Sequence, residues 1–136
     1  MVMQRLAGWL AVGGLSVVAA SSLASAQPQS FVVTSVHVDH SGLWRADPNG
    51  RQTATDCKAF VLHDPEALKW FQASSEVDQH TWLEELDWTQ CSADGTLQTG
   101  DGRSYSWELD QSGRGRIVLN KNVSVFLKGA ELPFAN

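Results

Sequence analysis

Histidine is the side chain best suited to acid–base and metal chemistry near neutral pH, and this chain has four of them. His37, Asp39 and His40 share one short run, while His63 and His80 lie farther along. On a strand, His37 and Asp39 would project to the same side and could hold a metal ion or act as an acid–base pair. Because no spacing is that of a zinc-binding helix, we favour a solvated strand end. A zinc site built from separated residues stays open as the alternative.

Other catalytic patterns are missing from the sequence. It contains neither the G-x-S-x-G run of serine hydrolases nor the G-x-x-x-x-G-K run that cradles phosphates. The glycine-rich stretch 112–116 lacks the strand-to-helix setting of a phosphate loop. The adjacent Glu84 and Glu85 are typical of a solvated surface. We therefore expect no catalytic residue, no metal ligand and no cofactor, and an enzyme is the less favoured interpretation.

Cys57 and Cys91 are the two cysteines of the chain. An even pair in an exported protein predicts a disulfide, because compartments outside the cytosol are oxidising. The bridge would close a loop of about 35 residues and stabilise the fold by about 3–4 kcal/mol on the chain-entropy estimate. Two buried thiols or a zinc site are the alternatives, although the pair lacks the C-x-x-C spacing of structural zinc.

The first 26 residues have the pattern of a secretory signal peptide. Arg5 gives a positive start, residues 6–20 are apolar, and Ala24-Ser25-Ala26 forms an A-x-A cleavage site. The alternative is an uncleaved membrane anchor, but the apolar run is shorter than the roughly 20 residues that a span needs. Cleavage would leave residues 27–136 as a single exported domain with no further membrane span, which we expect in the periplasm.

The charge of the chain bears on its partners. The formal net charge is −5, and loss of Arg5 with the leader would leave 9 basic and 15 acidic residues, or −6. These charges are spread along the chain without a basic cluster. Nucleic acid and anionic membranes are therefore disfavoured as partners, and a cationic partner is favoured.

The elements that must position these groups begin with a strand at 31–38. Its Val32, Thr34, Val36 and Val38 share the face that we expect to be buried. The pattern also predicts a turn at 40–42, a short strand at 43–45, a turn at 47–50 and a strand at 53–62.

A helix is predicted from Asp64, which could cap its free amides, with Pro65 in the first turn. Ala67, Leu68, Trp70 and Phe71 then recur at helical spacing, and Ser74 ends the helix. Residues 76–88 fit either a second short helix or an irregular arm over the core.

From Cys91 onward the apolar residues recur with a period of two. Short strands are predicted at 93–99, 104–110, 116–119 and 123–127. We interpret the Asp94-Gly95 pair as a break in the first of them, and Asp101-Gly102 as a hairpin turn. Such strands form an antiparallel meander whose aromatic face packs against the helix and whose polar face meets water.

Five tryptophans follow the leader, a high number for a chain of this size. Trp70, Trp88 and Trp107 have core-like spacing. Trp44 and Trp82 lie outside the regular elements, so we take them as candidate binding anchors. The alternative is that both cover edges of the core.

The chain from Cys57 onward resembles a group of small exported proteobacterial proteins of unassigned function. The shared pattern is C-x-x-F, paired aromatics on a helix, D-W-x-x-C-x-x-x-G-x-L, G-x-x-x-x-W-x-L and G-x-G, found here at 57–60, 70–71, 87–97, 102–109 and 113–115. The resemblance covers most of the mature chain and implies one domain with paired cysteines, but no activity. A weaker likeness in size, export, meander and disulfide is to periplasmic lysozyme inhibitors, whose diagnostic loop is not evident here.

These observations predict an α+β fold: an antiparallel meander sheet of about five or six strands, one short helix packed on it and one disulfide. They favour a small periplasmic binding module, similar to an inhibitor or an immunity protein, that docks on another envelope protein. The alternative is a small periplasmic hydrolase or metal-dependent enzyme that uses the His37–His40 segment.

Overall fold

Six antiparallel strands form one sheet in the order β1-β3-β4-β5-β6-β2 in the computed structural model, which describes residues 13–14 and 31–134. The strands are β1 Val33–Trp44, β2 Ser75–Val77, β3 Cys91–Thr99, β4 Ser104–Asp110, β5 Arg114–Asn120 and β6 Val123–Lys128. The helices are α1 Ala54–Cys57, α2 Asp64–Ala73 and α3 Gln79–Glu84. The predicted α+β fold is confirmed, whereas nearly all of the predicted signal peptide lies outside the described residues.

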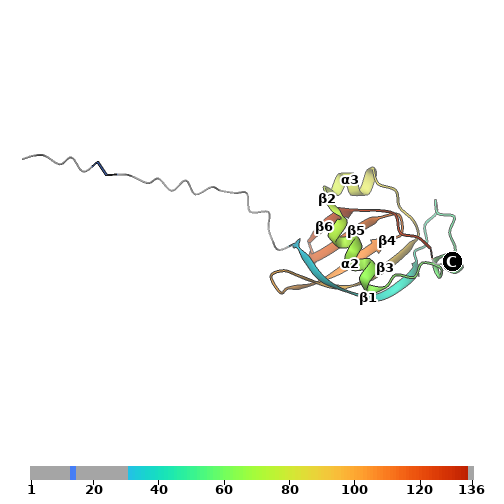
Figure 1. Cartoon of the computed structure of the whole chain (residues 1–136). Helices are drawn as coiled ribbons and strands as arrows, with labels where there is room; N and C mark the ends of the chain where they lie inside the picture. The colour runs from blue at the N-terminus through green and yellow to red at the C-terminus, as the bar shows by residue number, and fades with distance from the viewer. Residues whose placement is uncertain (1–12, 15–30, 135–136) are drawn as a thin grey trace, which may run out of the picture.

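The long helix α2 covers one face of the sheet, and α3 lies beyond its β6–β2 end (Figure 1). The core forms between α2 and the alternate residues of β3 to β6 that face it. The Phe71 ring makes edge contacts with Trp70 at 5.1 Å and with Trp107 at 5.3 Å between centroids. Two of the three predicted core tryptophans, Trp70 and Trp107, are therefore buried in one cluster. The prediction for Trp88 is wrong, because its side chain is 41% exposed.

The face of β1 predicted to be buried is correct from Val36 onward, since Val38 also packs against the core, but it is wrong at the start of the strand. Val33 and Val36 are buried, whereas Val32 is exposed. The pairing with β3 shifts register between Val33 and Ser35, so the simple alternation fails there. Such a bulge turns the side chains that follow to the other face, and the sequence period does not reveal it.

Two other predictions for the first half are wrong. Residues 40–45 do not form a turn and a new strand; β1 runs on to Trp44 through two more register shifts, with Gly42 at a φ of 66°. Residues 53–62 are not a strand. Thr53 caps α1 in a capping box with Asp56, and this local bonding favours a helical turn over an extended chain.

Strand β3 is continuous through the Asp94-Gly95 pair that we took for a break. Gly95 lies where β1 and the Trp107 ring approach β3 most closely. A Cβ there would meet the His37 carbonyl oxygen and lie 2.9 Å from the Trp107 ring. Gly95 is therefore needed because β1 and the Trp107 ring lie too close to β3 for a side chain, and not because the chain turns there.

Asp64 does not cap α2 as predicted, because the N-cap is His63, which makes no side-chain cap bond. The Asp64 carboxylate instead accepts a hydrogen bond of 2.8 Å from the Val38 amide on the free edge of β1. Gln72, later in the same helix, donates to the Val33 carbonyl at 3.2 Å. Helix α2 thus occupies polar backbone groups on an edge strand that would otherwise be open to another chain.

The predicted disulfide is confirmed between Cys57, at the end of α1, and Cys91, at the start of β3. It joins the segment between β1 and α2 to the start of β3, the strand next to the β1 edge of the sheet. In the described part of the chain, no helix is long and apolar enough to cross a membrane.

Candidate functional site

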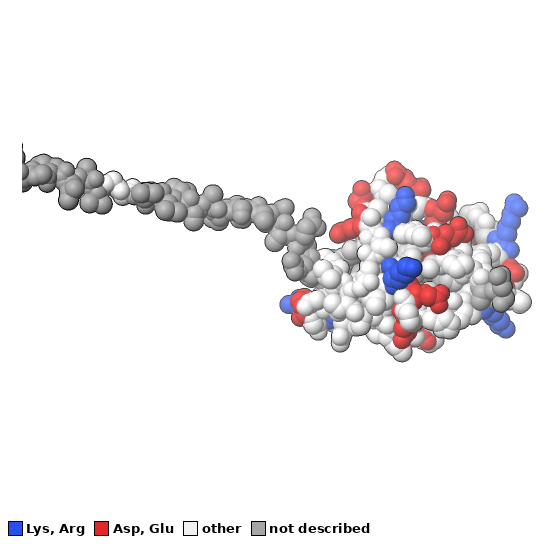
Figure 2. All heavy atoms as spheres, in the orientation of Figure 1, with Lys and Arg blue, Asp and Glu red and all other residues white. Residues whose placement is uncertain are grey.

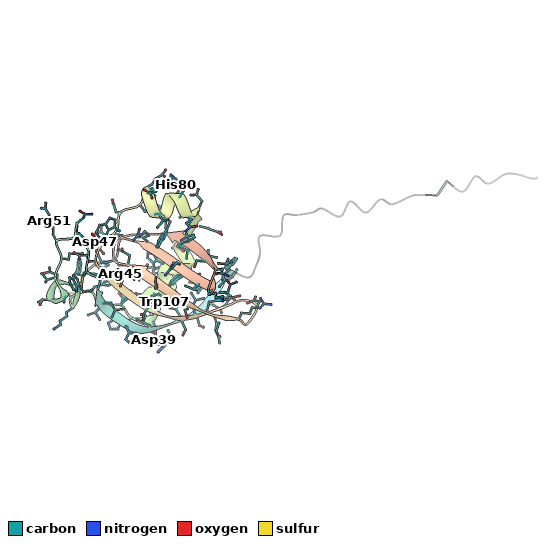
Figure 3. All side chains as sticks on the ribbon, turned by 180° about the vertical axis from the view of Figure 1, so that it is seen from behind. Asp39, Arg45, Asp47, Arg51, His80 and Trp107 are labelled. Carbon is teal, nitrogen blue, oxygen red and sulfur yellow. A yellow bond between two sulfur atoms is a disulfide. The ribbon has the colours of Figure 1, made fainter. Side chains whose placement is uncertain are left out.

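A pocket of about 330 Å³ lies on the face of the sheet that α2 leaves uncovered. Its floor is made by polar residues of β3 and β4 that alternate with the buried core residues, namely Ser92, Asp94, Glu108 and Asp110. One wall is the end of β1 and the turn after it, and the other is α3 with the arm 85–90. Figure 3 shows this side of the sheet, with the labelled Arg45 and Asp47 near each other beside it and His80 on α3.

Three large apolar side chains that line the pocket are exposed. Leu43 comes from β1, Leu83 from α3 and Trp88 from the arm, with exposed fractions of 37%, 51% and 41%. Leu43 is far in the sequence from Leu83 and Trp88, and only the fold brings it to them. An isolated exposed leucine needs no explanation, but convergence on one concavity is typical of a binding surface.

The two walls are fastened together by Gln90, whose side chain is buried. Its Nε2 donates to the Arg45 carbonyl at 2.9 Å, and its Oε1 accepts from the Gln52 amide at 2.8 Å. The Gln52 side chain in turn accepts from the Gln90 amide at 2.8 Å. These bonds, close to the disulfide at Cys91, hold the pocket in shape without a ligand, which lowers the cost of binding.

Asp110 holds the arm onto the floor. Its carboxylate accepts hydrogen bonds from the Thr89 amide at 2.9 Å and the Thr89 hydroxyl at 2.8 Å, and from both the amide and the hydroxyl of Ser112 at 2.8 Å. With this many donors Asp110 is a structural group, although it lines the pocket.

Arg114 and Trp82 form the inner end of the pocket. The Arg114 guanidinium carbon lies 4.2 Å from the centroid of the Trp82 ring, and Arg114 donates to the Trp82 carbonyl at 3.2 Å. Burial lowers the pKa of Arg114, and the nearby Asp110 carboxylate opposes this shift. The positive charge of Arg114 is thus committed to partners within the chain.

The two predicted anchors have different settings. Trp82 lines the pocket but is half-buried, with its indole donating to the Gly115 carbonyl at 2.8 Å and its ring 5.1 Å from that of Phe126. Trp44 is exposed, donates to the Gln52 carbonyl at 2.9 Å and does not line the pocket. A binding role for either stays a prediction. Sequence reasoning missed Trp88, although its place in an acidic arm without apolar periodicity could have indicated exposure.

The structure brings His37 close to two carboxylates, with 3.3 Å from its Nε2 to Asp39 and 3.4 Å from its Nδ1 to Asp64. His40 pairs instead with Asp94, at 2.8 Å. His37, Asp39 and Asp64 do not line the pocket. Within residues 13–14 and 31–134, no three His, Cys, Asp or Glu residues are arranged to hold a metal ion.

Comparison of the chain with protein-family models, with curated proteins and with solved structures found no match. The function is therefore inferred from the pocket itself.

Proposed function

We propose that this chain is a small exported binding module, similar in role to an inhibitor or an immunity protein, which docks on another protein of the bacterial envelope through the pocket. The observation that carries the proposal is the convergence of exposed Leu43, Leu83 and Trp88 on a concavity that Gln90 holds in shape. A tryptophan in such a setting is a typical anchor of protein interfaces. The apparent signal peptide and the disulfide support a periplasmic location.

The test is capture from envelope extract on protein purified from the periplasm after expression of the full chain. We expect a protein that is retained by the wild type and lost from both Trp88→Ala and Leu83→Ser, with a loss of about 2 kcal/mol in binding. Val123→Ser is the matched control, because Val123 is equally exposed but lies at the β5–β6 turn, outside the pocket. Retention of the same proteins by wild type and Trp88→Ala would rule out the pocket as the docking site.

A further inference from the structure

We infer that the pocket receives a basic side chain, an arginine or a lysine, from the surface of the protein partner, with its cationic head over Asp94 and Glu108. This inference rests on the proposed function, since it names the chemistry of the partner at the same site. Three observations support it: the pairing register of β3 with β4, the apolar walls of the pocket and the negative charge of the surface around it.

Asp94 and Glu108 lie directly opposite each other on β3 and β4. Side chains in this relation have Cβ atoms about 5 Å apart, and like charges placed so destabilise a sheet. His40 contacts the Oδ1 atom of Asp94, and Arg116 contacts the Oε2 atom of Glu108 at 2.6 Å. The other oxygen of each carboxylate accepts no hydrogen bond from the described residues. Arg116 already offsets part of this repulsion, and a cation over the pair would offset more of it and use both free oxygens.

The walls suit the stem of such a side chain. Arginine and lysine bury their methylene groups along apolar surface while the charged head stays with polar groups. Exposed Leu43 and Trp88 supply that surface, and the Trp88 ring can also attract the cation through its π face. A metal ion is a poorer occupant, because no three ligating residues converge in the described chain.

The surface beside the pocket has the matching charge. Residues 76–88 contain five acidic side chains (Glu76, Asp78, Glu84, Glu85 and Asp87), all exposed, and no lysine or arginine. Figure 2 shows acidic atoms gathered at the end of the molecule where Figure 1 places α3. A second copy of this acidic chain would be repelled, whereas a basic partner would be attracted and steered.

Two basic residues, Arg45 and Arg114, line the pocket. Arg114 interacts with Trp82 and Asp110, whereas Arg45 makes no ion pair with the residues that the structure describes. Arg45 therefore tests whether the ligand is positively or negatively charged. Removing the charge of Arg45 should leave the affinity for a cation unchanged or increase it, and should decrease the affinity for an anion.

The experiment uses two synthetic peptides, acetyl-Leu-Arg-Leu-amide and the same peptide with citrulline, the neutral analogue of arginine. Each is titrated to millimolar concentration while NMR follows the indole N–H signals of Trp88 and Trp82. We expect the arginine peptide to shift the Trp88 signal, to lose affinity with added salt, and to bind about tenfold more tightly than the citrulline peptide. Equal affinities, or no shift of either indole, would overturn the inference.

Variants of the pocket test which of its carboxylates bind the cationic group of the peptide. Asp94→Asn with Glu108→Gln should weaken the arginine peptide about tenfold and leave the citrulline peptide unchanged. Glu66→Gln with Asp39→Asn, neither of which lines the pocket, is the charge-matched control, and Arg45→Gln should not weaken the arginine peptide. Because the double variant loses the Arg116–Glu108 ion pair and the His40–Asp94 contact as well as the repulsion, its thermal unfolding is measured beside the titration to verify that it is folded. Unchanged arginine affinity in the double variant, or weaker affinity in Arg45→Gln, would overturn the inference.

Failure of the inference and failure of the proposed function are distinguishable. If capture of a partner depends on Trp88 but not on Asp94 and Glu108, the pocket is still the docking site, but the inference that it receives a basic side chain is wrong. If capture does not depend on Trp88, the proposal that the pocket is the docking site is wrong. The peptide titration would still show whether the pocket binds a cation in preference to a neutral group.

Discussion

At the scale of single residues, exposure divides the tryptophans into two classes. The Trp107 side chain is 1% exposed and donates a hydrogen bond of 2.9 Å to the Thr96 carbonyl, whereas Trp88 stands at the mouth of a pocket. Trp107→Ala should cost about 3–5 kcal/mol in the free energy of unfolding, because it removes a large buried ring. Trp88→Ala should change it by less than about 0.5 kcal/mol.

Urea denaturation of the oxidised protein measures both changes. If Trp88→Ala destabilised the fold as much as Trp107→Ala, Trp88 would belong to the core, and the docking proposal would lose its central residue.

Asp64 gives a residue-scale prediction in acid. The Val38 amide, followed by His37, holds the pKa of the Asp64 carboxyl below its ordinary value of 3.8. The folded state thus favours the charged carboxylate, so this stabilisation is present above pH 3.8 and is lost as the pH falls through the lowered pKa. Asp64→Asn should unfold more readily at neutral pH and lose less stability on acidification.

Thermal unfolding of both proteins between neutral pH and pH 2.5 checks this prediction. Asp78 and Asp101 also have lowered pKa values, from hydrogen bonds with Thr81 and Thr99, so part of the acid dependence should survive in the variant. An identical dependence in the two proteins would contradict the role given to Asp64.

At the scale of elements, the central strand β3 depends on Gly95. A methyl group at this position would press on the β1 backbone and lie within 3 Å of the Trp107 ring. Gly95→Ala should therefore destabilise the fold by about 1–3 kcal/mol, as overpacking does, and loosen the pairing of β1 with β3. Thr96→Ala is the control, because that side chain is exposed on the same strand.

Denaturation and amide hydrogen exchange along β1 would measure the two effects. Should Gly95→Ala prove neutral, the close approach of the strands at this point would be wrong.

At the scale of the whole molecule, the disulfide joins the α1 end to the sheet across a sequence separation of 34. Its reduction frees that loop in the unfolded chain, so the free energy of unfolding should fall by about 3–4 kcal/mol. Because the same bridge lies next to Gln90, reduction should also weaken binding at the pocket.

Thiol titration of the denatured, unreduced protein from the periplasm should find no free thiol. Two free thiols there would contradict both the bridge and the expected compartment.

The elements that the sequence predicts well are those whose signals are local. Period-two alternation located β4, β5 and β6 to within a few residues, and the Asp64-Pro65 start with apolar residues at helical spacing located α2. The acidic segment 76–88 was ambiguous because its apolar residues fit either a helix or an arm. It contains both a helix, α3, and the start of the arm 85–90. Asp78 favours the helix because its side chain accepts a hydrogen bond from the Thr81 amide and so caps α3.

The sequence by itself determined the cysteine pair, the helix and the meander, because two cysteines allow one pairing and because period and capping act between near neighbours. The tertiary structure alone decided where β1 changes the face that it buries, and that Gly95 lies at a close approach of β1 to β3. It also brought Leu43, Leu83 and Trp88 to one pocket. These outcomes depend on register and bulges, which are set by packing between strands far apart in the chain, and no local pattern of residues encodes that packing.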